Sequence, residues 1–382
     1  MKSANPGHLR KARWSISLIF FCYGLIFSSW AARIPTIQAI YDLSEAQLGT
    51  LLITLPLGSF ISLPIAGYLS ARFGSKLVVQ LSIIFYAVCL ISIAYVPSIY
   101  WIGLLLFLLG LSANAVNIAI NTQAVDLGKI MNKTIMATFH GLWSLAGFFG
   151  AAIGALFISH SVSIEVHYLI IFVITISCAL LSFSNLLNNK SKEPDNTPVF
   201  VLPDRSLLLL GTIAFCSMLI EGTMFDWSGV YFKKVVGAEQ KWLGLGYVAF
   251  MISMAGMRFL ADTITNKFGA KRLVIFSGVC SFVGLVLVIF LPTLIYATLG
   301  FFIVGIGVSA VIPIVFSLAG HTKKMSPSIA LAAVSTMGFF GFLLGPPVIG
   351  FIAELFDLKI SFSFIALMAL LIVMLAARIK AS

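Results

Sequence analysis

Two carboxylates lie within one long apolar stretch of the sequence, residues 206–232. Glu221 and Asp226 are five residues apart, and most side chains around them are apolar or small. A carboxylate in the middle of a membrane-spanning helix costs about 2.5–3.5 kcal/mol, so such residues usually have a function. The stretch holds no basic residue, so loss of hydration favours the neutral form of Glu221. We predict that Glu221, together with Asp226, binds a transferable proton; alternatively, Glu221 stays ionised and binds a ligand or Arg33, and Asp226 simply meets water at an interface.

Three asparagines follow one another at helical spacing in an earlier apolar stretch. Asn114, Asn117 and Asn121 occupy positions i, i+3 and i+7, which cover only about 60° of a helix. Exposing an amide to lipid is energetically unfavourable, so we predict that these side chains line a polar cavity. Hydrogen bonding between packed helices is the alternative. His140 is expected at a similar depth and could contact the same solute or handle a proton, or it could be a buried neutral histidine.

Arginines inside apolar stretches suggest gates. Arg33 ends the first stretch at a depth that corresponds to Asp226 in the second half of the chain. We predict that Arg33 faces the cavity, where it binds the solute or pairs with Asp226 when the outer side is closed; the alternative is that Arg33 extends its charge to the interface. Arg258 and Asp262 lie four residues apart and are predicted to pair within one helix beside the inner gate.

The elements that must position these residues are predicted to be transmembrane helices. Of the 382 residues, 60% are hydrophobic and 10% charged, whereas an ordinary soluble domain has about 25% charged residues. A hydrocarbon core of about 30 Å needs roughly 20 apolar residues per helix. Twelve such windows can be counted, approximately 14–34, 47–70, 77–96, 100–124, 135–159, 166–187, 206–232, 242–265, 273–292, 294–319, 328–353 and 359–379. The fold class predicted is therefore an all-α integral membrane protein with twelve transmembrane helices.

The chain repeats itself on either side of a polar interval. Ala71-Arg72-Phe73-Gly74-Ser75-Lys76 matches Asn266-Lys267-Phe268-Gly269-Ala270-Lys271, and Gly147-Phe148-Phe149-Gly150 matches Gly338-Phe339-Phe340-Gly341. The interval between the copies is rich in Asn, Lys, Ser, Pro and Asp, which cannot form a core. We predict two pseudo-symmetric six-helix halves, residues 1–187 and 206–382, joined by a linker at 188–205. This is the plan of a duplicated membrane transporter.

The net charge of +11 indicates orientation rather than nucleic-acid binding. If the N-terminus is inside, 18 of the 24 basic residues fall on the cytoplasmic side. Cytoplasmic segments carry such an excess, so both termini and the linker are predicted to be cytoplasmic, and the chain to lie in a bacterial inner membrane. The five cysteines have no metal-like spacing, and no HExxH or GxSxG motif is present. We therefore expect no metal, no cofactor, no nucleic-acid partner and no enzyme activity.

The loop that follows the second apolar stretch resembles that of the major facilitator superfamily. Gly67, Arg72, Gly74 and Lys76 match its pattern, whereas Ala71 stands where the family has an acid, as does Asn266 in the second copy. The resemblance implies a gating role for Arg72.

Several other runs are similar to those of a bacterial branch near the fucose and hexose proton symporters. They are Ser29-Trp30-Ala31-Ala32-Arg33-Ile34-Pro35, Met131-Asn132-Lys133-Thr134, His140-Gly141-Leu142-Trp143-Ser144-Leu145, and Glu221-Gly222 with Asp226-Trp227. Trp143 and Trp227 are accordingly expected to line the solute cavity. Fucose-type members carry coupling carboxylates on helices one and four, where this chain has Arg33 and the asparagines, so its proton coupling must use other groups.

These observations predict a secondary active transporter, expected to be a monomer surrounded by membrane lipid. It would take up a small polar solute, sugar-like or another small metabolite, together with protons, by alternating access. The alternatives are proton-driven efflux of small molecules and a non-transporting membrane sensor of the same fold. The absence of a proline from helix five weighs against the exporters that carry a Gly-Pro motif there.

Overall fold

The computed structural model describes residues 6–131, 135–188, 207–320 and 327–379. Within these ranges every regular element is a helix, and twelve helices are long and apolar enough to cross a membrane. This confirms the predicted all-α class and the twelve predicted spans. The predicted linker, apart from Asn188, and the run Asn132-Lys133-Thr134 lie outside the described residues.

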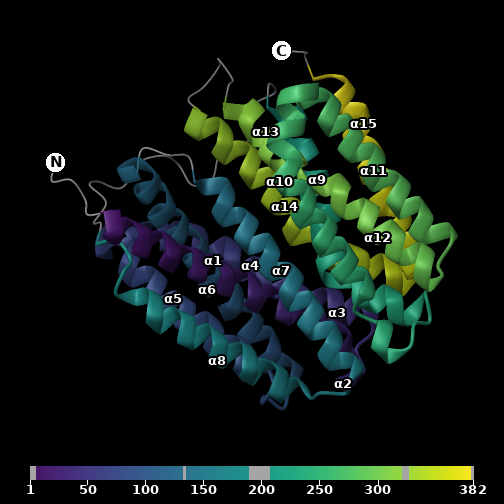
Figure 1. Cartoon of the computed structure of the whole chain (residues 1–382). Coiled ribbons are helices and arrows are strands. Elements are labelled where there is room, and N and C mark those ends of the chain that lie inside the picture. Colours follow the sequence, from purple (N-terminus) through teal and green to yellow (C-terminus); the bar gives the residue numbers. More distant parts are fainter. Residues whose placement is uncertain (1–5, 132–134, 189–206, 321–326, 380–382) are drawn as a thin grey trace. The chain divides into compact units, whose positions relative to one another are not determined.

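The first compact unit contains residues 1–30, 54–157 and 161–196. Its helices are α1 (Pro6–Ala32), α4 (Thr54–Phe73), α5 (Ser75–Ile93), α6 (Ile99–Met131), α7 (Met136–Ser159) and α8 (Ile164–Phe183). Helix α6 packs against α4 and α5, and α5 also packs against α8 (Figure 1).

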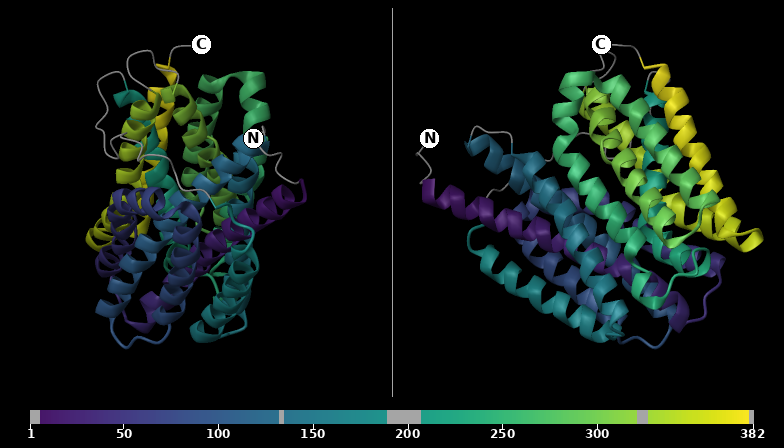
Figure 2. Two further views of the ribbon diagram at one scale, coloured as in Figure 1. Left: turned by 90° about the vertical axis from the view of Figure 1, so that its left-hand side faces the viewer. Right: turned by 45° about the vertical axis from the view of Figure 1, so that its right-hand side comes forward.

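The second unit contains residues 31–53, 158–160 and 197–382. It begins with two short helices, α2 (Ile34–Ile40) and α3 (Glu45–Leu52). The others are α9 (Leu208–Lys234), the 3-10 turn η1 (Gln240–Trp242), α10 (Leu245–Phe268), α11 (Ala270–Phe290), α12 (Leu294–Ser309), α13 (Val311–Gly320), α14 (Pro327–Leu355) and α15 (Leu358–Ala377). Helices α9 and α14 pack closely, and α11 packs between α12 and α15; Figure 2 shows this green-to-yellow bundle from two sides.

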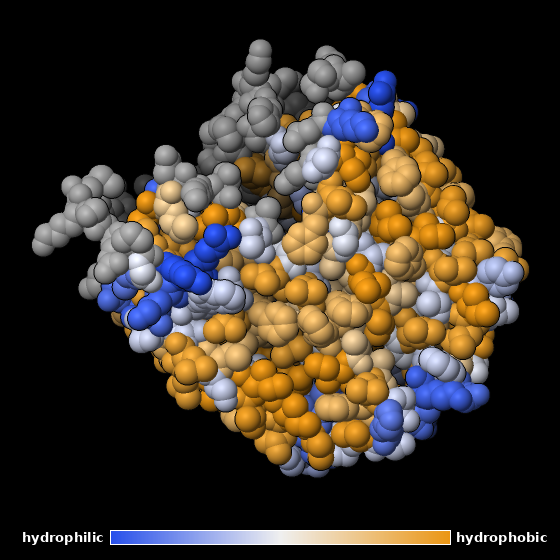
Figure 3. Space-filling model, viewed as in Figure 1, coloured by the Kyte–Doolittle hydropathy of each residue, from blue (hydrophilic) through white to orange (hydrophobic). Residues whose placement is uncertain are grey.

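The helices carry large apolar side chains on their outer surfaces. Leu181 is 73% exposed and Phe290 is 74% exposed. Apolar residues dominate the face that Figure 3 shows, and the charged residues gather toward its margins. A soluble protein rarely exposes such large apolar patches, so these surfaces are suited to contact with lipid.

The two copies of the loop motif adopt the same backbone conformation. Gly74 precedes α5 with φ 86° and ψ 144°, and Gly269 precedes α11 with φ 85° and ψ 150°. This region of backbone space is essentially restricted to glycine. The arginine and lysine two residues earlier also behave alike, since the charged groups of Arg72 and Lys267 lie 5.5 Å and 5.3 Å from the ring centroids of Phe73 and Phe268. The sequence repeat is thus a structural repeat.

The repeated Gly-Phe-Phe-Gly motif forms a helix-packing surface in both units. A Cβ on Gly150 of α7 would lie 2.8 Å from the Cβ of Ser28 and 3.1 Å from the carbonyl oxygen of Leu25, both on α1. In the second unit, Gly341 of α14 would meet the backbone of Phe215 on α9. Only glycine permits these close approaches of neighbouring helices.

Candidate solute and proton site

The carboxylate of Glu221 is buried within the second unit and is paired with an arginine. Arg258 of α10 donates a hydrogen bond from Nη2 to Oε1 of Glu221 on α9, at 3.1 Å. The side chain of Glu221 is 6% exposed and that of Arg258 is 22% exposed. An ion pair in such surroundings partly offsets the cost of burying both charges, and loss of either partner would leave an uncompensated charge.

Aromatic packing fixes the helices that carry this pair. One turn beyond Glu221, the ring of Phe225 makes edge-to-face contacts with Tyr247, Phe250 and Phe342, at centroid separations of 6.2, 5.7 and 6.5 Å. Such contacts are favoured by the ring quadrupole and add to the gain from burial. Tyr247 and Phe250 belong to α10 and Phe342 to α14, so the cluster holds α9 against both neighbours.

Arg258 has a partner on another helix, which helical spacing could not suggest. The predicted partner was Asp262 on the same helix, whereas the contact that is present joins Arg258 to Glu221 on another helix. The side chain of Asp262 lies outside the described part of the chain, so its pairing stays a prediction. Helical spacing cannot reveal a contact between residues 37 positions apart.

Arg33 lies in the second unit, at the break between α1 and α2. Its backbone is not helical, with φ −96° and ψ 1°, and the residue is only 3% exposed. Pro35, two residues later, contacts Gly229 on α9, three residues after the half-buried Asp226. The segments that carry Arg33 and Asp226 are therefore neighbours, and the pairing of the two side chains stays a prediction.

The three asparagines of α6 begin one turn beyond a tight contact with α4. A Cβ on Gly110 would meet the backbone of Leu55, and Ser59 Oγ donates to the Gly110 carbonyl oxygen at 2.9 Å. Asn114, four residues further along, is 8% exposed, and Asn117 and Asn121 are half-buried.

The hydrogen bonds of this stripe set the orientation of its amides. Nδ2 of Asn121 donates to the backbone oxygen of Asn117 at 2.8 Å and to its Oδ1 at 2.6 Å. Because a backbone oxygen can only accept, the amide nitrogen of Asn121 must face it. Oδ1 of Asn121 and Nδ2 of Asn114 are buried without a partner among the described residues. The stripe therefore offers one spare acceptor and one spare donor.

Gln123, which sequence reasoning left without a role, is a structural residue of the first unit. Its Nε2 donates to Ser75 Oγ at 2.8 Å and to the Leu187 oxygen at 2.9 Å, and its Oε1 accepts from the Leu187 amide at 2.8 Å. The side chain is fully buried. It joins α6 to α5 and to the segment that follows α8.

Aromatic rings of α1 lie against the predicted site residues of α7. Tyr23 and Phe27 approach Trp143 with centroid separations of 6.1 and 6.2 Å. The ring of Phe20 meets that of His140 at 5.8 Å, and His140 is exposed. Trp227 of α9 is fully buried. That these residues line a solute cavity stays a prediction.

Arg72 lies at the exposed end of α4. Its Nη1 donates a hydrogen bond to the hydroxyl of Tyr68, one turn earlier. The gating role implied by the loop motif stays a prediction.

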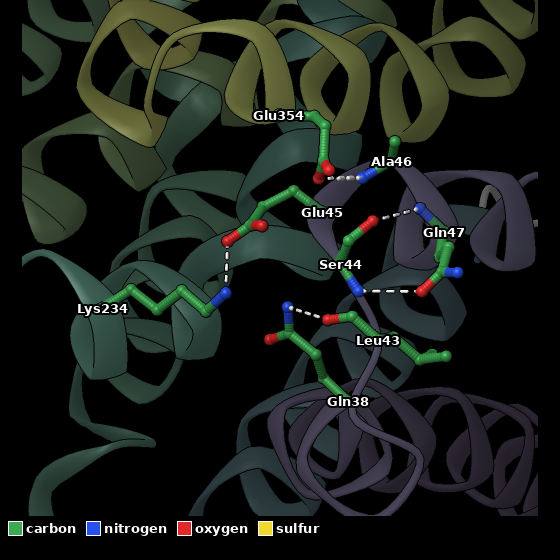
Figure 4. A network of polar contacts seen from close by, with 8 residues as sticks. All are labelled: Gln38, Leu43, Ser44, Glu45, Ala46, Gln47, Lys234 and Glu354. Atoms are coloured by element: carbon green, nitrogen blue, oxygen red, sulfur yellow. Dashed lines mark hydrogen bonds and ion pairs between the residues drawn. The ribbon is translucent and has the colours of Figure 1, made fainter.

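Sequence reasoning missed a polar network that joins α3 to α9 and α14 (Figure 4). Lys234, the last residue of α9, forms a salt bridge with Glu45 at the start of α3. Oε2 of Glu354 on α14 accepts a hydrogen bond from the backbone amide of Ala46 at 3.4 Å. The run Ser44-Glu45-Ala46-Gln47 is a capping box, and this signal could have revealed the separate helix.

Among the described residues, no group of three His, Cys, Asp or Glu side chains could hold a metal ion. Twelve apolar helices among the described residues, with buried charges and amides inside the spans, are typical of a polytopic membrane transport protein. Residues 16–328 match the family model of the Major Facilitator Superfamily. The chain therefore belongs to this superfamily, whose members are transporters rather than enzymes, and the predicted family resemblance is confirmed.

The relatives it resembles cover almost the whole chain. It is 34% identical over 358 residues to an uncharacterized MFS-type transporter of Yersinia pestis, spanning 93% of this chain and 92% of that protein. It is 33% identical over 364 residues to the uncharacterized transporter y4wD of Sinorhizobium fredii, spanning 94% and 96%. The crystal structure of the nucleoside transporter NupG superposes with a TM-score of 0.76, at 15% identity, over 96% of this chain and 99% of that one. The last similarity supports the fold alone, and membership of the fucose and hexose branch stays a prediction.

Proposed function

We propose that this transporter takes up a small polar solute together with protons, by alternating access. The observation that carries the proposal is the buried pair of Glu221 and Arg258. A proton that binds Glu221 would cancel its charge and weaken the bond to Arg258. Protonation therefore changes both the net charge of the pair and the strength of the bond between Arg258 and Glu221. A coupling site requires such a difference between its two protonation states. Asp226, further along α9, would extend the proton path.

The asparagine stripe supports a polar and uncharged solute. Nδ2 of Asn114 can donate to the solute and Oδ1 of Asn121 can accept from it, so hydroxyl or amide groups would satisfy both. The two residues are seven positions apart, about 10 Å along the helix. Leaving such buried groups unpaired costs about 1–3 kcal/mol each, and a solute that pairs them would recover part of that cost. His140 and Trp143, with the aromatic rings of α1, would contact the rest of the solute.

The distribution of basic residues supports the orientation. We propose that both termini and the linker face the cytoplasm and that the protein lies in the inner membrane, because cytoplasmic loops carry the excess of Lys and Arg. The face that carries Lys234 and Glu45 would then point outward.

Transport by the purified protein in liposomes tests the function. The assay uses radiolabelled sugars, sugar alcohols and nucleosides, with a pH gradient that is acidic outside. Accumulation of one of these solutes that collapses with a protonophore supports the proposal. Accumulation that ignores the protonophore overturns proton coupling. If none of these solutes shows uptake or counterflow, the proposed solute class is overturned.

A further inference from the structure

Two of the five cysteines lie side by side within the first unit. Cys22 on α1 and Cys178 on α8 share a hydrogen bond between their thiols. The side chain of Thr175, one turn before Cys178 on α8, also lies next to the Cys22 thiol. Both cysteines are free. We call Cys22 and Cys178 the thiol pair, because their sulfur atoms are adjacent although the residues are far apart in the sequence.

The packing of three helices holds the thiol pair in place. The ring of Tyr23, the residue after Cys22, lies 5.9 Å from the ring of Tyr86 on α5. Helix α5 also packs against α8, where Nε2 of Gln80 donates a hydrogen bond to the backbone oxygen of Phe183 at 3.4 Å. Helix α5 therefore contacts both helices that carry the thiols, and the pair does not depend on the second unit.

The two thiols differ in accessibility. Cys22 is fully buried, whereas Cys178 is half-buried.

Cys178 lies at the edge of the exposed surface of α8. Ile174 and Leu181 lie about 40° and 60° to one side of it around the helix, and both are exposed. Thr175 and Ser182 lie about 60° and 40° to the other side, and both are fully buried. A reagent that approaches the apolar outer surface would therefore reach Cys178 first.

An accessible cysteine beside a second, resolving cysteine is the usual arrangement of a redox-sensitive site. We propose that Cys178 and Cys22 form a redox site, which an apolar hydroperoxide such as a peroxidised lipid oxidises to a disulfide. The surroundings favour an oxidant that dissolves in hydrocarbon, because the residues exposed beside Cys178 are apolar. The inference goes beyond the proposed transport function and does not rest on it.

The oxidation has two steps. The sulfur of Cys178 attacks the terminal oxygen of the hydroperoxide, so that an S–O bond forms, the O–O bond breaks, and the thiol proton leaves with the alcohol. The sulfur of Cys22 then attacks that of Cys178, so that the S–S bond forms and water leaves with the Cys22 proton. The thiols lose two electrons, and the hydroperoxide is reduced to an alcohol and water. The product ties α1 to α8, and a dithiol reductant would reverse it.

Counting the thiols after oxidation tests the site in the full-length protein in liposomes. The protein is treated with cumene hydroperoxide, the remaining thiols are blocked with N-ethylmaleimide in detergent, and new disulfides are reduced and labelled with maleimide-polyethylene glycol. The wild type should gain two labels per chain, and dithiothreitol added before the block should remove both. This result needs no variant, so a folding defect cannot obscure it.

Two variants establish the order of the steps. In Cys22→Ala the disulfide should be lost, and Cys178 should stop at the sulfenic acid, which dimedone traps and mass spectrometry locates. In Cys178→Ala the disulfide should also be lost, and Cys22 should carry no dimedone, because it is fully buried.

Matched controls separate pairing from burial. Cys89 is buried like Cys22, and Cys280 is half-buried like Cys178. Cys89→Ala and Cys280→Ala should each keep both labels.

A second oxidant tests the route from the lipid. Hydrogen peroxide replaces cumene hydroperoxide, and each rate is divided by the rate of the same oxidant with glutathione in water. The apolar oxidant should then be the faster one.

Three outcomes overturn the proposal. The first is a wild type that gains no labels, and the second is a pair of labels that survives in Cys22→Ala. The third, a normalised rate for hydrogen peroxide that equals or exceeds that of cumene hydroperoxide, overturns the apolar oxidant. No solute is used here, so failure of the proposed function in the transport assay would leave this test intact.

Discussion

Arg258 reaches from α10 to Glu221 on α9 and holds its carboxylate with a bond of 3.1 Å between Nη2 and Oε1. This pair brings together two charges that lie in different membrane spans. Their burial is tolerated because each is the other's counter-ion. Any proton carried by Glu221 must therefore compete with Arg258.

We expect Glu221→Gln to abolish uphill uptake while counterflow at equal pH survives. Glutamine keeps the shape and can still accept a bond from Arg258, but it cannot release a proton. Uptake and counterflow in liposomes measure the two activities. Glu239→Gln, which changes an exposed carboxylate, is the control and should behave like the wild type. Loss of both activities together, or persistence of uphill uptake, would show that Glu221 is not the proton site.

Removal of Arg258 alone should destabilise the protein more than removal of both charges. Arg258→Gln leaves Glu221 buried without its counter-ion, which costs about 3–5 kcal/mol. The double variant Glu221→Gln with Arg258→Gln should recover much of this loss. Thermal unfolding of the four proteins in detergent gives the coupling. Additive losses would mean that the pair contributes nothing to the folded state.

Substitution by alanine should affect solute binding at Asn121 and thermal stability at Gln123, although both are amide residues of α6. Asn121→Ala is expected to weaken solute binding at least tenfold, because a spare acceptor is lost, while the yield of folded protein is kept. Gln123→Ala should lower thermal stability, because the amide and the oxygen of Leu187 lose their bonds to the side chain, at about 1–3 kcal/mol for each buried group. Solute binding and size-exclusion profiles separate the two effects. A folding defect in Asn121→Ala would assign the stripe to helix packing.

Two glycines on α4 provide a matched pair for helix packing. A Cβ on Gly58 would meet the carbonyl group of Phe107 on α6, whereas Gly67 has nothing within 4 Å. Gly58→Ala should therefore cost about 1–3 kcal/mol through overpacking. Gly67→Ala should be neutral or slightly stabilising, because alanine has the higher helix propensity. Thermal unfolding in detergent measures both, and equal effects would contradict the close packing of α4 on α6.

The number of spans, the helical class and the repeat of the loop motif could all be predicted from the sequence. These features depend on local properties, namely the length of each apolar run and the spacing of Gly74 and Gly269 within repeated motifs. The length of an apolar run predicts a membrane span directly, because the thickness of the hydrocarbon core sets a similar minimum length for every span. The backbone conformation of Gly74 and Gly269, with φ of 86° and 85° and ψ of 144° and 150°, is likewise essentially restricted to glycine.

The candidate charges could also be found from the sequence, because Glu221, Asp226, Arg33 and Arg258 stand out in apolar surroundings. Contacts of these charges with residues on other helices could not be found from the sequence. Helical periodicity relates residues three or four positions apart, so it suggested Asp262 for Arg258 and gave no partner for Gln123. The contacts that the structure adds join Arg258 to Glu221 on another helix and Gln123 to Leu187 in the segment that follows α8.

Tertiary structure alone decided that residues 31–53 belong with the second unit. Their sequence continues the first two spans, and hydropathy assigns them to the first half. The assignment is made instead by the fit of Gly49 against Pro346 and by the salt bridge of Glu45 with Lys234. Shape complementarity and charge pairing between distant segments exist only once the helices are packed, so no pattern along the chain can record them.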